Sequence, residues 1–310
     1  MKISIYAERK LLEWSSEMVI LAGLFKELPE ELPHNYNFRG EARMFGACQL
    51  AKDYFKYTEN PDRADIFILP YKFKGTNDSY FEFLADLAER NNKFLYAFYN
   101  DDDESYYDIP KNVRLYRTSM NERSRQDKEI PMPAFTADFF DNNYIIPEKP
   151  EIGYCGHTLH GRAKILNKIS NSGVHTNFIV RDGFWAPELP NKSEAKRQFV
   201  KNLEENLFTV CYRGAGNFSY RLYETLMMGR IPLLINTSTV LPENIKNQMV
   251  YLNVDEDDRE LEKKVFEYCH KLVKEDPINS LKAQWTNRKV WLNYSSPKGF
   301  INNFYNSCIG

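Results

Sequence analysis

Short apolar runs alternate along the chain with longer segments whose apolar residues recur every three to four positions. Such runs are typical of strands buried in a parallel sheet, and the three-to-four spacing is typical of amphipathic helices. Within 81–90, for example, Phe81, Leu84 and Ala88 fall on one helical face. The expected strands are residues 2–6, 64–69, 93–99, 151–155, 176–180, 207–212 and 231–235. The expected helices are residues 81–90, 162–171, 193–205, 218–228 and the helical stretch 285–305.

This alternation predicts an α/β fold in which parallel sheets carry helices on both faces. Between residues 130 and 151 several prolines interrupt the pattern, which then starts again, as is common where two domains are joined. We therefore expect two Rossmann-like, doubly wound domains over residues 1–145 and 146–290, and a final helix over 291–310. A ligand would bind between the two domains, outside the carboxyl ends of the strands.

Composition and charge narrow the class of protein. The 310 residues carry a formal net charge of −2, which argues against a nucleic-acid partner. Hydrophobic residues at 43% exclude a disordered chain, and the 20 tyrosines suit a site for flat polar ligands such as sugars. There is no apolar run long enough to span a membrane and no apolar region for a signal peptide at the start. Five widely spaced cysteines are typical of reduced thiols, so we expect a cytoplasmic protein.

The most informative stretch runs from residue 208 to 235 and reads as strand, glycine turn, helix and strand. Gly214 and Gly216 allow the backbone to come close to a ligand. Asn217 or Ser219 can cap the helix that follows, and both are candidate contacts to the nucleotide. Backbone N–H groups at that helix start favour an anion such as a diphosphate.

Charged side chains border the same turn. Arg213 and Arg221 could each form charge-assisted hydrogen bonds with phosphate oxygens. Glu224, inside the helix, could accept hydrogen bonds from a ribose diol, and Gly229 would end the helix. A dinucleotide fingerprint G-x-G-x-x-G is a competing reading, but Ser219 takes the place of its third glycine.

The whole stretch resembles the signature of the exostosin family, glycosyltransferase family 47. The elements that carry the resemblance are Gly214, Gly216, Ser219, Arg221, Leu222, Glu224, Gly229, Ile231 and Pro232. The resemblance implies a GT-B fold, an inverting mechanism and a UDP-sugar donor held by the second domain, with no metal cofactor. It also implies that the final helix crosses back to the first domain. The membrane anchor of many relatives is not expected in this chain.

A second glycine loop covers residues 156–161 and is followed by Arg162. The loop nearly fits the phosphate-binding pattern G-x-x-x-x-G-K-[ST], but Ala163 lacks the hydroxyl that would hold Mg²⁺, so ATP hydrolysis is not expected. Arg162 is the further phosphate candidate. His157 and His160 have no third ligand nearby, so we expect no zinc.

An inverting transferase needs a general base near the acceptor hydroxyl. Asp101 and Glu8 each follow an expected strand of the first domain, and Asp101 is the preferred candidate. Asp101 and Asp103 also form a D-x-D, which in a GT-A transferase would hold Mn²⁺ on the donor. A non-catalytic nucleotide-sugar-binding module is the third reading.

The sequence thus predicts a glycosyltransferase that moves a sugar from a nucleotide diphosphate, a UDP-sugar by resemblance, to a hydroxyl of a glycan acceptor. The sugar, the acceptor and the oligomeric state are not predicted.

Overall fold

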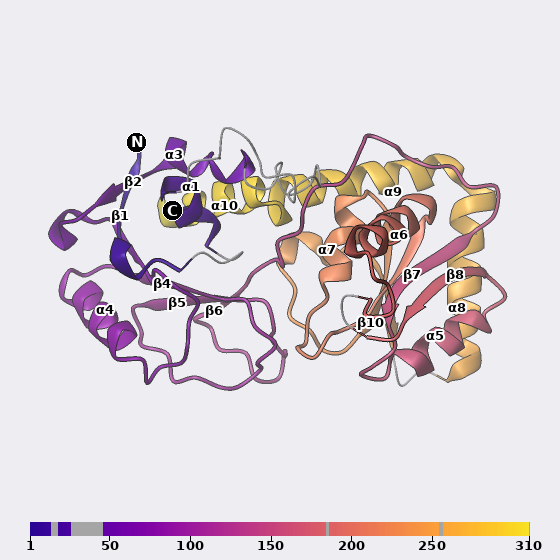
Figure 1. The fold of residues 1–310 in the computed structure, drawn as a ribbon, viewed down its shortest axis with the longest axis horizontal. Coiled ribbons are helices and arrows are strands. Elements are labelled where there is room, and N and C mark those ends of the chain that lie inside the picture. Colours follow the sequence, from indigo (N-terminus) through magenta and orange to yellow (C-terminus); the bar gives the residue numbers. More distant parts are fainter. Residues whose placement is uncertain (14–17, 26–45, 184–185, 254–256, 310) are drawn as a thin grey trace.

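The computed structural model describes residues 1–13, 18–25, 46–183, 186–253 and 257–309. Its strands form two separate sheets, of six and five strands, each in its own lobe (Figure 1). The two sheets lie on opposite sides of residue 145 in the sequence.

Every strand of the first sheet runs parallel to its neighbours, in the order β2-β1-β3-β4-β5-β6. The strands are β1 (Ile3–Tyr6), β2 (Phe55–Thr58), β3 (Ile66–Ile68), β4 (Leu95–Tyr99), β5 (Val113–Arg117) and β6 (Glu129–Pro131). The strands are short and mostly buried, as expected where both faces of a parallel sheet are covered.

Side-chain alternation divides β4 between two cores. Leu95, Ala97 and Tyr99 belong to the cluster on the face covered by α4 (Ser79–Arg90), whose first turn is capped by the Asp78 carboxylate. Tyr96 and Phe98 belong to the cluster on the other face. That face is covered by α1 (Val19–Phe25), α3 (Ala51–Tyr54) and a helix from the C-terminus of the chain. Short 3₁₀ turns lie at Arg9–Leu11 and Pro61–Arg63.

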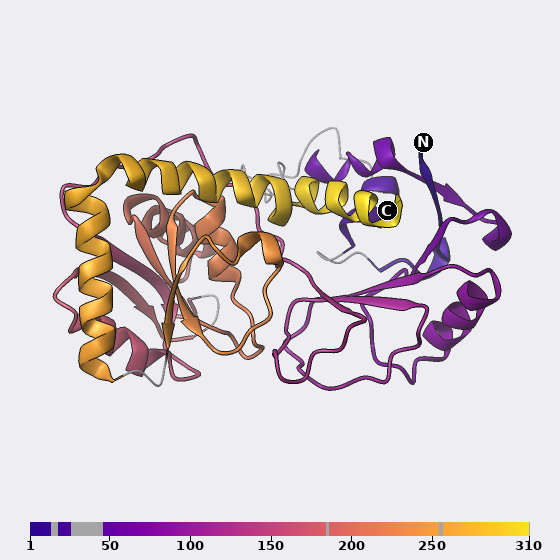
Figure 2. The same ribbon diagram turned by 180° about the vertical axis from the view of Figure 1, so that it is seen from behind.

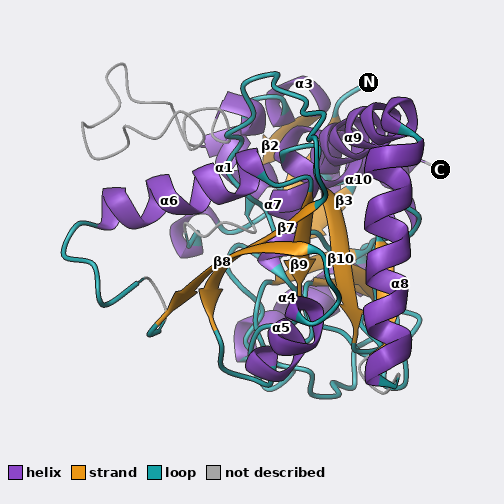
Figure 3. Ribbon diagram, turned by 90° about the vertical axis from the view of Figure 1, so that its right-hand side faces the viewer, coloured by secondary structure: helices purple, strands orange, loops and turns teal. Residues whose placement is uncertain are grey.

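The second sheet is also fully parallel, in the order β11-β10-β9-β7-β8. Its strands are β7 (Glu151–His157), β8 (His175–Arg181), β9 (Phe208–Cys211), β10 (Ile231–Asn236) and β11 (Val250–Asn253). One face packs against α5 (Arg162–Ser170) and α8 (Asp258–His270), and the other against α6 (Lys192–Glu205) and α7 (Tyr220–Met227) (Figure 3). A 3₁₀ turn at Glu243–Ile245 precedes β11.

Both sheets share the strand order 2-1-3-4-5 when each is numbered from its own first strand. In such doubly wound sheets the connections reverse direction next to the first strand, and ligands bind outside the carboxyl ends at that switch point. The switch points lie between β1 and β3 in the first domain and between β7 and β9 in the second.

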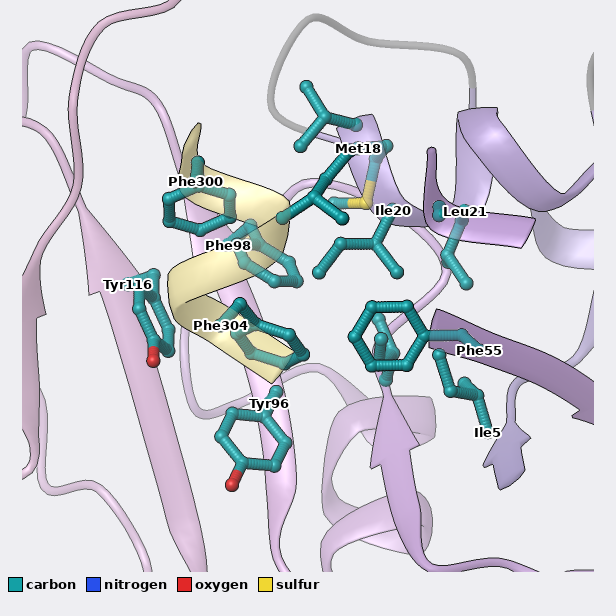
Figure 4. Close-up of a cluster of buried hydrophobic side chains, with 14 of the residues drawn as sticks. Ile5, Met18, Ile20, Leu21, Phe55, Tyr96, Phe98, Tyr116, Phe300 and Phe304 are labelled. Atoms are coloured by element: carbon teal, nitrogen blue, oxygen red, sulfur yellow. The ribbon is translucent and has the colours of Figure 1, made fainter. Parts of the chain in front are cut away.

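The C-terminal helices connect the two domains. After α8, the π-helical segment Lys271–Glu275 leads into α9 (Pro277–Val290), which is followed by the π-helical segment η6 (Trp291–Ser295) and by α10 (Pro297–Ile309). Figure 2 shows α9 lying on the second domain and α10 reaching the first. Phe300 and Phe304 of α10 enter the core between the first sheet and α1, where they pack against Phe98 and Tyr116 (Figure 4).

The strands and helices expected from the sequence are present, with bounds shifted by a few residues. One expectation was wrong in detail: the loop expected at 156–161 begins later, because β7 continues to His157. The strands β2, β5, β6 and β11 were not predicted from the sequence. The α/β class with two doubly wound parallel sheets is confirmed.

Candidate functional site

The carboxyl ends of the two sheets face each other through the loops that follow β4 and β9. The amide of Gly216 donates to Asp102 Oδ1 at 3.0 Å, and Arg213 Nη2 lies 2.6 Å from Glu104 Oε1. The Asn100 amide donates to the Tyr220 hydroxyl at 2.9 Å. The candidate nucleotide turn therefore meets the acidic run of the first domain.

A buried ion pair holds the acidic run in place. Arg117 and Glu129 are both 3% exposed, and their side chains approach to 2.6 Å. Arg117 also donates to the carbonyl oxygens of Asp103 and Ser105, at 2.6 and 3.1 Å. Removing either residue would leave the charge of the other buried and unpaired. The pair therefore holds the acidic run in one position.

The two carboxylates of the D-x-D are already engaged. Asp101 Oδ2 lies 2.7 Å from Lys72 Nζ. Asp103 accepts from the Tyr107 hydroxyl at 2.9 Å and from Ser105. Burial alone would raise the pKa of Asp103, but these hydrogen bonds outweigh it and lower the pKa. Within the described residues there is no group of three His, Cys, Asp or Glu side chains that could hold a metal.

The glycine turn is shaped by the domain contact. A Cβ on Gly216 would lie 2.5 Å from the Asp102 Cα, so a larger residue would push the domains apart. The Gly214 amide donates to the Phe218 carbonyl at 3.0 Å. These amides, expected from the sequence to face a diphosphate, have protein acceptors in this arrangement.

Asn217 is an interdomain anchor. Its side chain is fully buried, its backbone amide donates to Ser119 Oγ at 2.8 Å, and its side-chain amide donates to the Met120 and Thr237 carbonyls at 3.1 Å. The hydroxyls of Thr237 and Thr239 donate to its two oxygens. Because every polar group of Asn217 has a protein partner, the structure assigns it to domain packing and gives no support to nucleotide contact.

Helix α7 starts and stops as the sequence predicts. Ser219 is the N-cap residue by position, although its hydroxyl makes no capping bond. At the other end Gly229 adopts a φ of +65°, and its amide donates to Leu226. The Arg230 amide donates to Thr225, which completes a Schellman motif.

Arg221 is the centre of a cationic cluster at the β7/β9 switch point. Its Nη2 donates to the Cys155 carbonyl at 2.5 Å, and its guanidinium lies 4.2 Å from the centre of the Phe199 ring. Its Nη1 is buried without a hydrogen-bond partner among the described residues. A Cβ on Gly156 would meet the Tyr154 hydroxyl at 3.2 Å and Arg221 Nη2 only at 3.8 Å, an ordinary contact distance. A buried N–H without an acceptor is costly, and an anionic ligand would supply one.

Arg162 joins the cluster from the start of α5. Its Nη2 donates to the Arg213 carbonyl at 2.8 Å and lies 4.0 Å from the Cβ position of Gly214. Gly161 precedes it with a φ of +82°, as a turn into the helix requires. The structure thus brings together the three predicted arginines, Arg162, Arg213 and Arg221, beside the predicted glycine.

His157 ends β7 and lies against Arg162. Arg162 Nη1 is 2.8 Å from His157 Nε2, and the His157 side chain is buried. Burial and the adjacent guanidinium lower the pKa of His157 below the ordinary value of 6.5. The ring is therefore neutral at pH 7 and can accept a hydrogen bond from the guanidinium.

Glu224 lies one helical turn after Arg221, with 3.7 Å between its Oε2 and Arg221 Nε. Burial raises the pKa of Glu224, and the charge of Arg221 offsets only part of that rise. When ionised, this carboxylate has two oxygens that can accept hydrogen bonds from a pair of hydroxyls.

The candidate bases lie across the domain contact. Glu8 follows β1, at the β1/β3 switch point, and is half-buried. Asp101 follows β4, two strands away from β1 in the sheet, and is held by Lys72. His157 was not predicted from the sequence as a partner of Arg162, although its place where a strand meets a glycine loop, five residues before Arg162, was a usable signal.

There is no family model and no curated protein that matches the chain. Among solved structures, a glycosyltransferase from Rickettsia africae ESF-5 aligns over 99% of both chains, with 11% identity and a TM-score of 0.46. Alr3699/HepE of Anabaena, solved with UDP-glucose, covers 99% of this chain and 98% of its own, with 9% identity and a TM-score of 0.43. WaaG, a glycosyltransferase involved in lipopolysaccharide biosynthesis, covers 99% and 100%, with 10% identity and a TM-score of 0.41. These are distant likenesses, so the chemistry rests on this chain's own residues.

Two doubly wound domains whose strand ends face each other, with a last helix returning to the first domain, make up the GT-B architecture. The predicted fold class is therefore confirmed. In the part of the chain that the structure describes, no helix is both long and apolar enough to cross a bilayer.

Proposed function

We propose that this chain is a glycosyltransferase that takes its sugar from a nucleoside diphosphate donor, a UDP-sugar, and transfers it to a hydroxyl of a glycan acceptor. The observation that carries the proposal is the arginine cluster at the β7/β9 switch point. Its central residue, Arg221, has a buried Nη1 without a partner among the described residues. A cationic site at this place in a doubly wound sheet suits a phosphorylated ligand.

Different residues of the cluster would bind different parts of the donor. Arg221 and Arg162 bind the diphosphate oxygens, and Glu224 accepts the two hydroxyls of the ribose. Arg213 now contacts Glu104 of the other domain at 2.6 Å. It would bind phosphate as well after releasing that carboxylate. Three guanidinium groups against the two carboxylates of Glu104 and Glu224 leave the site with a net positive charge, which suits a diphosphate.

Catalysis then depends on the leaving group. As the bond between the anomeric carbon and the diphosphate oxygen breaks, the electron pair stays on the diphosphate and its charge grows. Preorganised donors at such a position are typically worth about 3–4 kcal/mol each in rate terms. An exposed helix N-terminus supplies only about 0.3–1 kcal/mol. The arginines must therefore supply most of the stabilisation of the leaving diphosphate. This agrees with the amides of Gly214 and Gly216, which already donate to protein acceptors.

The reaction would proceed by a single displacement with inversion. The acceptor oxygen attacks the anomeric carbon from the face opposite the diphosphate, and its proton passes to a carboxylate of the first domain. Glu8 lies at the β1/β3 switch point, where a ligand of that sheet is expected. Asp101, the candidate preferred from the sequence, would first have to release Lys72. We therefore propose Glu8 as the general base, with Asp101 as the alternative against which it is tested.

A panel of UDP-, GDP- and CMP-sugars tests the proposal, with release of the nucleotide as the readout and proton NMR for the anomeric configuration of the product. We expect turnover with a UDP-sugar, a product of inverted configuration, and a far larger loss in Glu8→Gln than in Asp101→Asn. Failure of every donor to bind or react would overturn the proposal. Retained configuration would overturn the inverting mechanism alone, and equal losses would remove Glu8 as the base.

One observation favours a second candidate, a non-catalytic nucleotide-sugar-binding module. The carboxylates of the acidic run are occupied by Lys72, Tyr107 and Ser105. If the chain binds a UDP-sugar but shows no turnover with any of a broad panel of acceptors, it is a binding module and not an enzyme. Membership of the exostosin family remains a prediction from the sequence motif.

A further inference from the structure

The outward face of α9 and η6 carries large apolar side chains in solvent. Ile278 is 66% exposed, Trp285 is 55% exposed and Leu292 is 41% exposed. Their spacing of seven residues corresponds to about two helical turns, so they form one stripe along the helix. Single exposed apolar residues are ordinary, but a regular stripe of them on one helix calls for a partner.

Lysines alternate with the apolar residues on the same stripe. Lys282 and Lys289 are both exposed, and the Lys289 ammonium lies 4.9 Å from the centre of the Trp285 ring. From Pro277 to the end of the chain there is no Asp or Glu, although the whole sequence has 43 of them. The C-terminal helices are therefore locally basic in a protein of nearly neutral charge.

The opposite side of α9 is firmly packed, so the stripe is a fixed surface. Gln284 is fully buried and exchanges hydrogen bonds with the backbone of Ile145. Arg288 forms two bonds of 2.9 Å with the Asp138 carboxylate and a third with the carbonyl of Met227. Its charge is thereby neutralised. Figure 2 shows α9 on the outside of the second domain, along the edge from which α10 leaves for the first.

We propose that this stripe, residues Ile278, Lys282, Trp285, Lys289 and Leu292, binds the surface of a membrane that contains anionic lipids. The lysines would meet lipid phosphates, and the apolar side chains would enter the region between head groups and acyl chains. Tryptophan suits that position because its ring is apolar and its N–H is polar.

Charge complementarity separates this occupant from the alternatives. A second copy of the chain would place lysines against lysines across a two-fold axis, which is unfavourable. A protein partner would have to supply matched carboxylates and pockets for three side chains spaced along about 21 Å of helix. An anionic lipid surface needs no such pattern. The inference does not depend on the proposed glycosyltransferase activity.

The test is flotation of the full chain with phosphatidylcholine vesicles, with and without phosphatidylglycerol. We expect binding only to the anionic vesicles, weakening as salt is added. Because each lysine near such a surface contributes about 1 kcal/mol, Lys282→Gln with Lys289→Gln should weaken binding about 30-fold. Trp285→Gln with Leu292→Gln should also abolish most of it. The matched control, Lys201→Gln with Phe83→Gln, replaces an exposed lysine of α6 and an exposed ring of α4 and should bind like the wild type.

Three outcomes would overturn the inference. The first is absence of binding to anionic vesicles at low salt. The second is binding that the stripe variants leave unchanged, or that the control variant loses equally. The third is a concentration-dependent dimer, seen by light scattering, that Trp285→Gln converts to a monomer. Circular dichroism melting of each variant shows whether it is folded, so a loss of binding can be assigned to the surface.

Discussion

Replacing Arg221 with alanine tests whether the arginine cluster binds and activates a donor. In the resting fold the side chain donates to the Cys155 carbonyl at 2.5 Å and covers the Phe199 ring at 4.2 Å. Hydrogen bonds from a charged group are worth about 1.5–3 kcal/mol and a cation–π contact about 0.5–2 kcal/mol. Arg221→Ala should therefore lower the free energy of unfolding by about 2–5 kcal/mol.

The effect on the reaction should be larger than the effect on the fold. Loss of one preorganised donor to the leaving diphosphate should reduce kcat by about 10²–10³-fold. UDP affinity should fall as well, since the Nη1 that lacks an acceptor in the resting fold would bind phosphate in the complex. Arg221→Lys keeps the charge but not the two-pronged geometry, so it should recover only part of the loss.

The matched control is Arg288→Ala. Arg288 contacts the carbonyl of Met227, at the opposite end of α7, and is bonded to Asp138. Removing it should destabilise the chain by about 3–5 kcal/mol, because the partly buried Asp138 carboxylate loses its ion pair. Its UDP affinity and turnover should match those of the wild type, measured by calorimetry and nucleotide release well below the unfolding temperature. The reasoning is refuted if Arg221→Ala is destabilised as predicted but retains kcat and UDP affinity within about twofold, a difference worth only about 0.4 kcal/mol.

Four further predictions follow from the same contacts. Arg230 is fully buried and donates to three backbone carbonyls and to Gln284, so Arg230→Met should cost about 3–5 kcal/mol in urea unfolding. The raised pKa of Glu224 means that its native state loses stability as pH rises above 4.5, so Glu224→Gln should stabilise the fold at pH 7 while weakening UDP binding. The lowered pKa of His157 means that stability is lost as pH falls below 6.5, and His157→Gln should remove that slope from unfolding curves. Sugar transfer should persist in EDTA, which a metal bound by the acidic run would not allow.

The sequence predicted the α/β class because buried parallel strands and amphipathic helices leave strong local patterns. It did not predict β6, since Glu129 puts a carboxylate into a strand of three residues. That charge is tolerated only because Arg117 lies beside it in the fold. Arg117 is 12 residues away in the sequence, so a local pattern around Glu129 does not reveal it. The strand β2 was missed because it has only four residues, Phe55–Thr58, of which one is a lysine and only Phe55 is fully buried.

The same limit applies to the site. The three arginines stand out in the sequence because they lie next to glycine turns, and such turns have a local signature. At Gly216 the close approach that the sequence predicts is made by Asp102 in this arrangement, a partner from the other domain that leaves no local signal. The sequence could not show the packing role of Asn217, because the hydroxyl and carbonyl groups that surround it come from distant loops.

The choice between the candidate bases also needed the fold. Asp101 and Glu8 each follow a strand, and the sequence alone favours Asp101. Strand order reverses that preference, because β1 borders the switch point of its sheet and β4 does not. The salt bridge of Asp101 to Lys72 adds a second difference that no local pattern could reveal.

The most direct test of the nucleotide site is a crystal structure of the chain soaked with UDP. The account predicts diphosphate density between the ends of β7 and β9, within hydrogen-bond distance of Arg221 and Arg162, with the ribose hydroxyls on Glu224. Density for UDP at any other place, or a site that stays empty at a UDP concentration that raises the melting temperature, would contradict it.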